Sequence, residues 1–371
     1  MVVTGTTGVP GGISTLNLNI LLAVQEIARE RGAEVEVLSY LDGSGDEPDF
    51  LNEDVSFRSF GGSKTRLSIA LARKPIDADL LLFDHVTLTP PILPLWSVRE
   101  AKVVVFAHGS EAWRDVKRAS RWVFERVDLC LTNSNFTLRR MEQELRDFNG
   151  KPCLLGLSPV FDLNHSVDYE GGGDLHLTAA DGNEYKLGER VLLLVGRMMR
   201  GEPGKGRWPL VQVLPDILHQ YPDAQVVFPG PGDEREDLAE YAEELGVGKS
   251  VFLPGFVSDQ VLDRLYRKCF AYVMPSRQEG FGLVYLEAMN YAKPCIGCWG
   301  DGAQDVIVNS KTGYLLDKGS YKGLFDAVTK LLENPERAKE FGENGFRRLH
   351  DNFTSSHFRD RFKERVEGVV K

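Results

Sequence analysis

Apolar runs of strand length alternate with helix-period segments along almost the whole 371-residue chain. This alternation is typical of parallel βαβ units, in which a helix after each strand returns the chain across the sheet. It predicts an α/β protein with doubly wound sheets. The predicted strands are 2–3, 33–39, 79–84, 102–107 and 128–132 in the first half, and 190–195, 224–228, 250–253, 270–274 and 294–297 in the second.

A chain of this length exceeds what one hydrophobic core usually holds, so two domains are expected. The alternation breaks within 150–187, a polar, turn-rich stretch with glycines at 171–173. We therefore predict an N-terminal domain at 1–165, a linker excursion with a surface hairpin at 166–187, and a C-terminal domain at 188–350. A helix is expected within 351–371, and its return to the first domain is left open.

Charge and cysteine content narrow the class of protein. The formal net charge of −10 argues against a nucleic-acid-binding surface as the main function. Among five cysteines, only Cys295 and Cys298 form a CxxC, and they fall on a predicted strand without a second pair, so buried thiols are expected instead of a zinc site. No signal peptide and no membrane-length apolar run is found, which predicts a cytoplasmic protein, with a position at the inner face of the membrane left open.

The most informative window is 275–289, with the sequence PSRQEGFGLVYLEAM, between an apolar strand and a helix. A glycine-flanked turn into a helix collects free backbone N–H groups and the positive helix end at one point, which favours binding of phosphate. Glu279 lies in the turn, whereas Glu287 lies roughly one turn inside the helix. The two carboxylates are therefore expected to have different roles.

This window resembles the signature of the retaining glycosyltransferases of family 4. The resemblance implies a GT-B fold, with two Rossmann-like domains facing each other across a cleft. It implies that the donor sugar is bound near Gly280 and Phe281, with Glu279 as a catalytic residue facing it. It also implies that Gly282 and Leu283 bind the donor diphosphate and that Glu287 holds the nucleotide ribose.

Two further segments of the second half resemble motifs of the same family. Val195-Gly196-Arg197 followed by Lys205-Gly206 is similar to its Gly-Arg … Lys-Gly loop, although the intervening loop is longer than usual. Arg197 and Lys205 would stabilise the negative charge that develops on the departing diphosphate. Pro254-Gly255-Phe256-Val257 is similar to the nucleobase segment, so Phe256 and Val257 are predicted near the base.

The first half carries weaker signals. The run from Gly8 to Gly12 lacks a full GxGxxG, and it is either an ordinary βα turn or the family's Gly-Gly loop, in which case Gly12 approaches the diphosphate. His108 follows a strand and resembles the family's histidine at the reacting centre, so it is a predicted catalytic residue; a structural histidine is the alternative. For His85, also at a strand end, the structural interpretation is favoured.

Metal and membrane contacts are the remaining alternatives. The only D-x-D, Asp77-Ala78-Asp79, immediately precedes a strand, where solvated carboxylates are expected. With Arg197 and Lys205 serving the diphosphate, we expect no obligatory metal and no cofactor besides the nucleotide sugar. The basic and aromatic segment 113–127 fits either a helix on an anionic membrane or a helix packed on its own sheet, and the second is favoured.

Together these features predict a hexosyltransferase, and the resemblance to family 4 implies that it retains the anomeric configuration. It would move a sugar from a nucleoside diphosphate, UDP before GDP, to a hydroxyl of a sugar or lipid-linked acceptor in polysaccharide, glycolipid or glycoconjugate assembly. A front-face mechanism is expected, because the two glutamates do not form the facing pair of a glycosidase. The alternatives are a sugar-nucleotide epimerase of the same fold and a non-catalytic sugar-nucleotide-binding protein.

Overall fold

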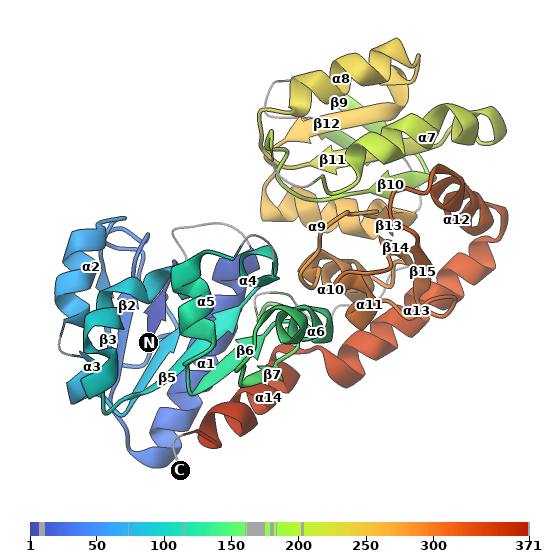
Figure 1. Ribbon diagram of the computed structural model, residues 1–371. Helices are drawn as coiled ribbons and strands as arrows, with labels where there is room; N and C mark the ends of the chain where they lie inside the picture. Colours follow the sequence, from blue (N-terminus) through green and yellow to red (C-terminus); the bar gives the residue numbers. More distant parts are fainter. Residues whose placement is uncertain are drawn as a thin grey trace. The chain divides into compact units, whose positions relative to one another are not determined.

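The computed structural model divides the chain into two compact units. One comprises Met1–Phe161 together with Asn352–Lys371, and the other comprises Asp162–Asp351 (Figure 1). The structure describes residues 1–6, 12–72, 74–113, 116–159, 161, 175–178, 182, 184–201 and 204–369.

The N-terminal unit is built on a seven-stranded sheet in the order β3-β2-β1-β4-β5-β6-β7. Every neighbouring pair is parallel. The chain starts in the middle of the sheet, winds outward through β2 and β3, and then reverses, so that β1 and β4 flank the point where the strand order changes. The strands are β1 Val2–Val3, β2 Val35–Ser39, β3 Val55–Ser59, β4 Leu80–Phe83, β5 Lys102–Ala107, β6 Leu129–Thr132 and β7 Gly150–Pro152.

Short and long helices connect these strands. They are α1 Gly12–Arg31, α2 Lys64–Leu71, α3 Lys74–Asp77, α4 Ser110–Trp113, α5 Arg118–Phe124 and α6 Asn135–Glu144, with 3₁₀ helices η1 Val86–Leu88 and η2 Pro90–Val98. The predicted apolar stripe of α1 is buried at Leu16, Ile20 and Ala23.

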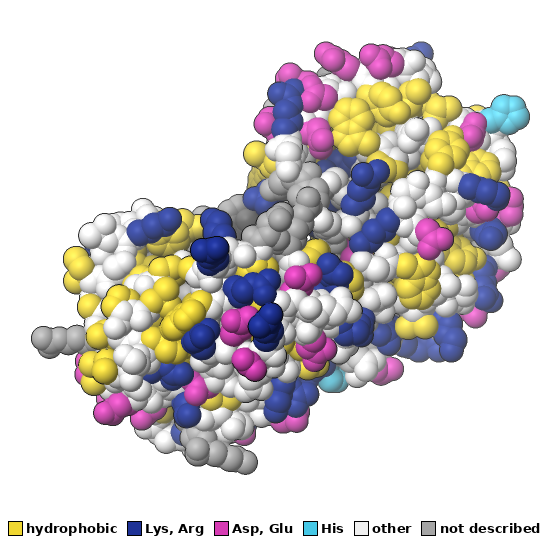
Figure 2. Space-filling model, viewed as in Figure 1, with side chains coloured by type: hydrophobic (Ala, Val, Ile, Leu, Met, Phe, Trp, Pro, Cys, Tyr) yellow, Lys and Arg dark blue, Asp and Glu magenta, His cyan; other side chains and the backbone are white. Residues whose placement is uncertain are grey.

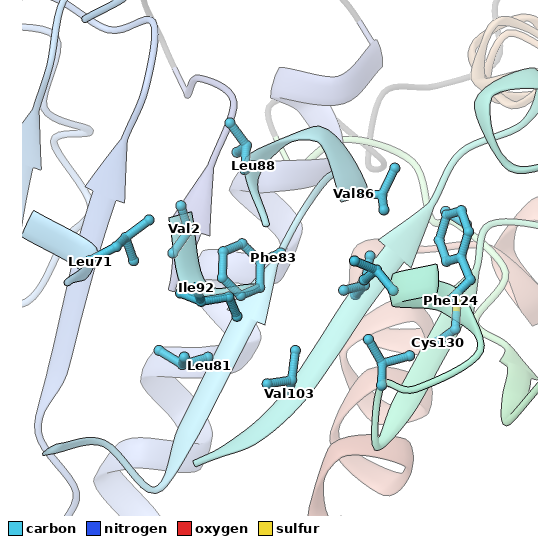
Figure 3. Close-up of a cluster of buried hydrophobic side chains, with 14 of the residues drawn as sticks. Val2, Leu71, Leu81, Phe83, Val86, Leu88, Ile92, Val103, Phe124 and Cys130 are labelled. Atoms are coloured by element: carbon cyan, nitrogen blue, oxygen red, sulfur yellow. The ribbon is translucent and has the colours of Figure 1, made fainter. Parts of the chain in front are cut away.

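One hydrophobic cluster fills the space between this sheet and the helices on one of its faces (Figure 3). Phe83 and Val103 of the central strands meet Ile92 of η2, and Phe124 of α5 covers the cluster near Cys130. The apolar side of α5 therefore packs on its own sheet, as the sequence favoured for segment 113–127.

The C-terminal helix α14, Ser355–Glu367, belongs to the N-terminal unit and packs along α1. Ser355 donates a hydrogen bond to Asn19 of α1, and the Arg361 guanidinium donates to the carbonyl of Leu154. Phe358 and Phe362, which belong to α14, are fully buried. The last segment of the chain thus completes the first unit.

The C-terminal unit repeats the doubly wound plan with a parallel sheet in the order β12-β11-β10-β13-β14-β15. Here β10 and β13 flank the point where the strand order reverses. The strands are β10 Val191–Leu193, β11 Gln225–Pro229, β12 Val251–Gly255, β13 Ala271–Val273, β14 Cys295–Cys298 and β15 Gly313–Leu316. The connecting helices are α7 Arg207–Gln220, α8 Arg235–Glu244, η3 Gly248–Ser250, α9 Asp259–Lys268, α10 Leu283–Asn290, α11 Ala303–Val306, α12 Tyr321–Glu333 and α13 Pro335–Asn352.

Several helices of both units begin at a hydroxyl side chain that accepts a hydrogen bond from the first turn. Such a cap satisfies one of the backbone N–H groups that lack a partner at a helix start, and it stabilises the helix by about 1 kcal/mol. The capping residues are Ser63 for α2, Ser134 for α6, Ser258 for α9, Ser320 for α12 and Thr354 for α14.

The stretch predicted as a linker with a hairpin contains two antiparallel strands, β8 Leu175–Thr178 and β9 Glu184–Leu187. Tyr185 packs edge-on against Phe252 of β12, and Gly188 donates to the side chain of Gln225. Within the described residues, this pair of strands therefore belongs to the C-terminal unit. Much of 166–187 lies outside the described residues.

Each predicted strand overlaps a strand of the structure, whereas β3, β7 and β15 were not predicted. Cys295 and Cys298 are buried free thiols on β14, as expected, and burial raises the pKa of the Cys298 thiol to about 12. Among the described residues, no helix combines the length and the apolar character needed to cross a membrane.

Candidate active site

The carboxyl ends of β10 and β13 bring together the segments singled out in the second half of the sequence. In doubly wound sheets, ligands bind outside the carboxyl ends of the strands where the strand order reverses, because the flanking loops separate there. The loop after β10 carries Gly196 and Arg197, and the loop after β13 carries the segment 275–282. The strand order therefore places both predicted donor-binding loops at one position.

An ion pair joins these two loops. The Lys205 ammonium donates to Glu279 Oε2 at 2.6 Å, although the residues are 74 positions apart in the sequence. The Glu279 side chain is 13% exposed and that of Lys205 is 34% exposed. Lys205, the predicted diphosphate-binding cation, is thus held by Glu279, the predicted sugar-facing carboxylate, beyond the carboxyl ends of the strands.

Close backbone contacts hold the loop after β10. The Arg207 side chain, only 3% exposed, donates to the Gly196 carbonyl at 2.7 Å and to the carbonyl of Arg197. Gly230 lies so close that a Cβ there would be 2.2 Å from the Gly196 carbonyl oxygen. The Arg197 side chain itself is exposed.

The loop after β13 ends in the N-terminus of α10. Gly282 has φ = +92°, a left-handed conformation that favours glycine, and no side chain caps this helix through a hydrogen bond. The first N–H groups of α10, starting at Leu283, thus form the kind of uncapped helix end that binds phosphate. Phe281 is 1% exposed, so its ring belongs to the core and only its backbone can face a ligand.

The next loop, after β14, supports this turn from behind. Gly302 donates its N–H to the Glu279 carbonyl at 2.7 Å, and a Cβ on Gly302 would be 2.1 Å from the Gly280 carbonyl oxygen. Beside it, the Asp301 carboxyl is 1% exposed, with Oδ1 accepting from Ala303 N–H at 2.9 Å and Oδ2 at 3.9 Å from Lys318 Nζ. Burial raises the pKa of Asp301 to about 7.

Glu287 occupies the second turn of α10 and is held by a neighbouring helix. The Tyr266 hydroxyl of α9 donates to Glu287 Oε2 at 2.6 Å. Burial raises the pKa of Glu287, and this hydrogen bond opposes the rise because it favours the ionised carboxylate. Phe256, in the predicted nucleobase segment after β12, is 66% exposed, whereas Val257 is half-buried.

The N-terminal unit places His108 and His85 side by side after β5 and β4. Their rings stack at 5.7 Å, and His108 Nε2 lies 2.5 Å from the Asp84 carbonyl oxygen. Glu111 accepts from the backbone N–H groups of His108 and Gly109, and Asn133 donates to the His108 carbonyl. These contacts fix His108 at the carboxyl end of the sheet.

Asp84, at the end of β4, anchors the other side of this arrangement. Its buried carboxylate accepts from Thr4 N–H at 2.7 Å and from the Asn17 amide at 2.8 Å, and burial raises the pKa of Asp84. Burial likewise lowers the pKa of His85. Gly12 is the exposed first residue of α1, while residues 7–11 of the glycine run lie outside the described residues.

The remaining predicted features are surface groups. Asp77 and Asp79 are exposed, as expected for solvated carboxylates. In the described part of the chain, no group of three or more His, Cys, Asp or Glu side chains is arranged to hold a metal ion. Figure 2 shows Lys and Arg side chains interspersed with Asp and Glu on the visible face instead of one continuous basic surface.

Residues 180–348, which contain this arrangement of loops, match the family model of glycosyl transferases group 1. The domain at residues 180–348 belongs to glycosyl transferases group 1. The match covers the loops after β10, β11, β12, β13 and β14, so the contacts between Lys205 and Glu279 and between Tyr266 and Glu287 lie inside the family's own domain.

Solved structures agree with this membership at the level of the fold. The chain is similar to sucrose-phosphate synthase from Thermosynechococcus elongatus, with a TM-score of 0.73, 17% identity and coverage of 99% of this chain and 98% of that one. It is also similar to Anabaena HepE in complex with UDP, with a TM-score of 0.75, 17% identity and coverage of 99% of both chains. With its two doubly wound units, the chain has the GT-B fold.

Curated relatives match more closely in sequence. A Mycobacterium tuberculosis protein named GDP-mannose-dependent alpha-(1-6)-phosphatidylinositol monomannoside mannosyltransferase is 33% identical over 257 residues, 66% of this chain and 64% of the relative. The Mycobacterium leprae phosphatidyl-myo-inositol mannosyltransferase is 26% identical over 88% of this chain and 85% of its own length. The chain thus spans just under two thirds of the first of these relatives.

Three residues at this family site were missed from the sequence. Arg207 directly follows the predicted Lys-Gly pair, and the signal available in the sequence was a charged residue at the start of a helix. Asp301 follows the end of β14, and its burial could not be inferred from the sequence. Tyr266 had no signal at all, because its contact joins two different helices.

Proposed function

We propose that this protein is a retaining glycosyltransferase that moves a hexose from a nucleoside diphosphate sugar to a hydroxyl acceptor. The observation that carries the proposal is the Lys205–Glu279 ion pair beside the uncapped N-terminus of α10, at the strand-order reversal of the family domain. Within one set of loops, the cation and the helix end match the diphosphate of such a donor, and the carboxylate matches its sugar.

The diphosphate is assigned to the positive elements of these loops. Lys205 and Arg197 supply cations, the N–H groups of Gly282 and Leu283 supply donors at the helix end, and Gly12 is also assigned to the phosphates. Fixed positive groups stabilise the charge that grows on the leaving phosphate as the glycosidic bond breaks, so they act mainly in the transition state.

The other parts of the donor follow from the same assignment. Glu287 holds the ribose, and the exposed Phe256 with Val257 lies at the base. Gly280 and the backbone of Phe281 line the sugar, which Glu279 orients at the reacting carbon. His108 is assigned as the second catalytic residue, and in a front-face displacement the leaving phosphate takes the acceptor proton.

The ion pair gives Lys205 two partners. Without donor, Glu279 neutralises the ammonium; with donor, the diphosphate competes for the same cation. Lys205 then neutralises less of the Glu279 charge, so the carboxylate can stabilise the positive charge that develops at the anomeric carbon of the sugar. This role for side-chain cations supports turnover without an obligatory metal ion, which stays a prediction.

For the donor, the names of the relatives favour a nucleotide different from the one that the sequence placed first. The M. tuberculosis relative is named as GDP-mannose-dependent, which supports GDP-mannose over a UDP-sugar. Its name also includes a phosphatidylinositol mannoside, which supports a lipid-linked sugar as acceptor. UDP-sugars remain the second arm of the test.

The deciding experiment is a thermal-shift screen with GDP, UDP and their hexoses, followed by a transfer assay with phosphatidylinositol mannoside. A ligand at about a hundred times its dissociation constant stabilises the folded state by about 2.7 kcal/mol. Binding of a nucleotide sugar with transfer to the lipid supports the proposal. Conversion of the sugar without acceptor would identify an epimerase, and binding without any turnover would identify a binding protein.

Two variants separate the roles of the glutamates. Glu287→Ala should weaken binding of both the intact donor and the bare nucleoside diphosphate, because both contain the ribose. Glu279→Gln should leave the affinity for the bare diphosphate unchanged or slightly tighter, since it releases Lys205, while transfer falls strongly. Near wild-type transfer by Glu279→Gln would move the reacting centre elsewhere.

A further inference from the structure

The carboxylate of Glu287 is held by a group outside its own helix. Tyr266, on α9, donates its hydroxyl to Glu287 Oε2 at 2.6 Å, and its ring is fully buried. No group within the described part of the chain bonds Glu287 Oε1. One oxygen therefore faces a fixed protein donor, and the other is left for a ligand.

The Tyr266 ring has little freedom to move. It stacks on Tyr291 at 5.3 Å with an interplanar angle of 4°, and on Tyr272 at 6.2 Å with an angle of 29°. A phenol also has few rotatable bonds, so a ring fixed on two sides places its hydroxyl at a defined point. Tyr266 is therefore suited to select one orientation of the Glu287 carboxylate.

In this pair the Tyr266 hydroxyl is the hydrogen-bond donor and the Glu287 carboxylate is the acceptor. Burial and the neighbouring Glu287 raise the pKa of the Tyr266 phenol well above its usual value, so the hydroxyl stays protonated and always donates. A hydrogen bond donated to a carboxylate favours its ionised form, which accepts from hydroxyl groups of a ligand. Removal of the phenol oxygen would take away this hydrogen bond, so the half-buried carboxylate would be less well oriented.

We propose that Tyr266 is a positioning residue for the nucleotide ribose: it holds Glu287 so that the free carboxylate oxygen receives the ribose hydroxyls. The inference rests on the proposed function, in which Glu287 binds the ribose. It adds that the selectivity for a hydroxylated ribose depends on a tyrosine that does not touch the nucleotide.

The test measures how strongly the protein distinguishes a ribonucleotide from its 2′,3′-dideoxy form. Calorimetry with GDP and dideoxy-GDP, and with UDP and dideoxy-UDP, gives the ratio of dissociation constants for wild type and for Tyr266→Phe. We expect this ratio to fall about five- to tenfold in Tyr266→Phe, which corresponds to the upper part of the range for one net hydrogen bond, because the lost bond orients the carboxylate and is not itself made to the nucleotide. Loss of fold stability alone would weaken both ligands equally and leave the ratio unchanged.

Tyr291→Phe is the matched control. Tyr291 belongs to the same stack, and its hydroxyl donates to Asp263 Oδ1 at 2.8 Å instead of to Glu287. This variant should keep the wild-type ratio. In a Glu287→Gln background, Tyr266→Phe should have no further effect on the ratio, because the carboxylate that it positions is gone.

The outcomes separate the inference from the function on which it rests. An unchanged ratio in Tyr266→Phe, or an equal fall in Tyr291→Phe, would overturn the positioning role. Equal binding of ribo and dideoxy forms by wild type would overturn the ribose role of Glu287 and this inference with it, while transfer activity could stand. A wild type that binds none of the nucleotides would overturn the proposed function itself.

Discussion

Removal of either partner of the Lys205–Glu279 pair should show that the two side chains are energetically coupled. The changes are Lys205→Ala, Glu279→Gln and the double variant, compared with wild type without ligand. Lys205→Ala leaves a carboxylate that is 13% exposed beside no counter-charge, whereas the double variant leaves a neutral amide. The double variant should therefore be more stable than the sum of the single effects predicts.

The size of the coupling follows from the burial of the two groups. Exposed ion pairs contribute about 0.2–1 kcal/mol, and hydrogen bonds to charged groups about 1.5–3 kcal/mol. At 2.6 Å, with one partner largely buried and the other one-third exposed, we expect a value between these ranges. A coupling of about 1–1.5 kcal/mol is thus expected from urea unfolding of the four proteins.

Kinetics extend the same cycle to the reaction. If Lys205 stabilises the leaving diphosphate in the transition state, Lys205→Ala should lower kcat more than it raises KM for the donor, by about ten- to a hundredfold. For the unfolding measurements, the control is the exposed Arg200–Asp237 pair, at 2.5 Å in the same unit, whose coupling free energy should be smaller. Strictly additive unfolding energies together with unchanged kcat would refute the reasoning.

Three further perturbations test other parts of the site. The folded state binds the Asp301 proton more tightly than the unfolded chain does, since burial raises the pKa of Asp301 from 3.8 to about 7, so stability should be lost as pH rises through this interval. Between pH 5 and 8, the ionisation of Asp301 should lower the free energy of unfolding by about 2–3 kcal/mol. Asp301→Asn should remove this decline when urea unfolding is measured across the same pH range. An equal slope in both proteins would contradict the expectation. Gly302→Ala places a Cβ 2.1 Å from the Gly280 carbonyl oxygen and should lower transfer at least about tenfold, whereas Gly188→Ala, with only a 3.7 Å contact, should not. Transfer should survive thorough chelation with EDTA; complete loss that manganese or magnesium restores would show that side-chain cations do not suffice.

The local structure of the site could be predicted because it lies within short segments. The segment 275–289 predicted a glycine turn into a helix, and Gly282 is indeed the left-handed residue at the start of α10; phosphate binding there stays a prediction. The alternation of apolar runs likewise predicted the parallel sheets and most of their strands, because each strand is a short segment with its own pattern. The strands β3, β7 and β15 escaped prediction; all three lie at sheet edges, and a half-exposed edge strand such as β3 lacks the continuous apolar run of a central strand.

The sequence by itself determined the α/β class, the two-unit organisation and the residue types of the donor loops, all of which depend on spacing along the chain. Only the tertiary structure decided which side chains meet. Lys205 reaches Glu279 because the strand order makes β10 and β13 neighbours. Tyr266 reaches Glu287 because α9 packs beside α10. Such partners depend on sheet order and helix packing, which bring together groups that no spacing along the sequence relates.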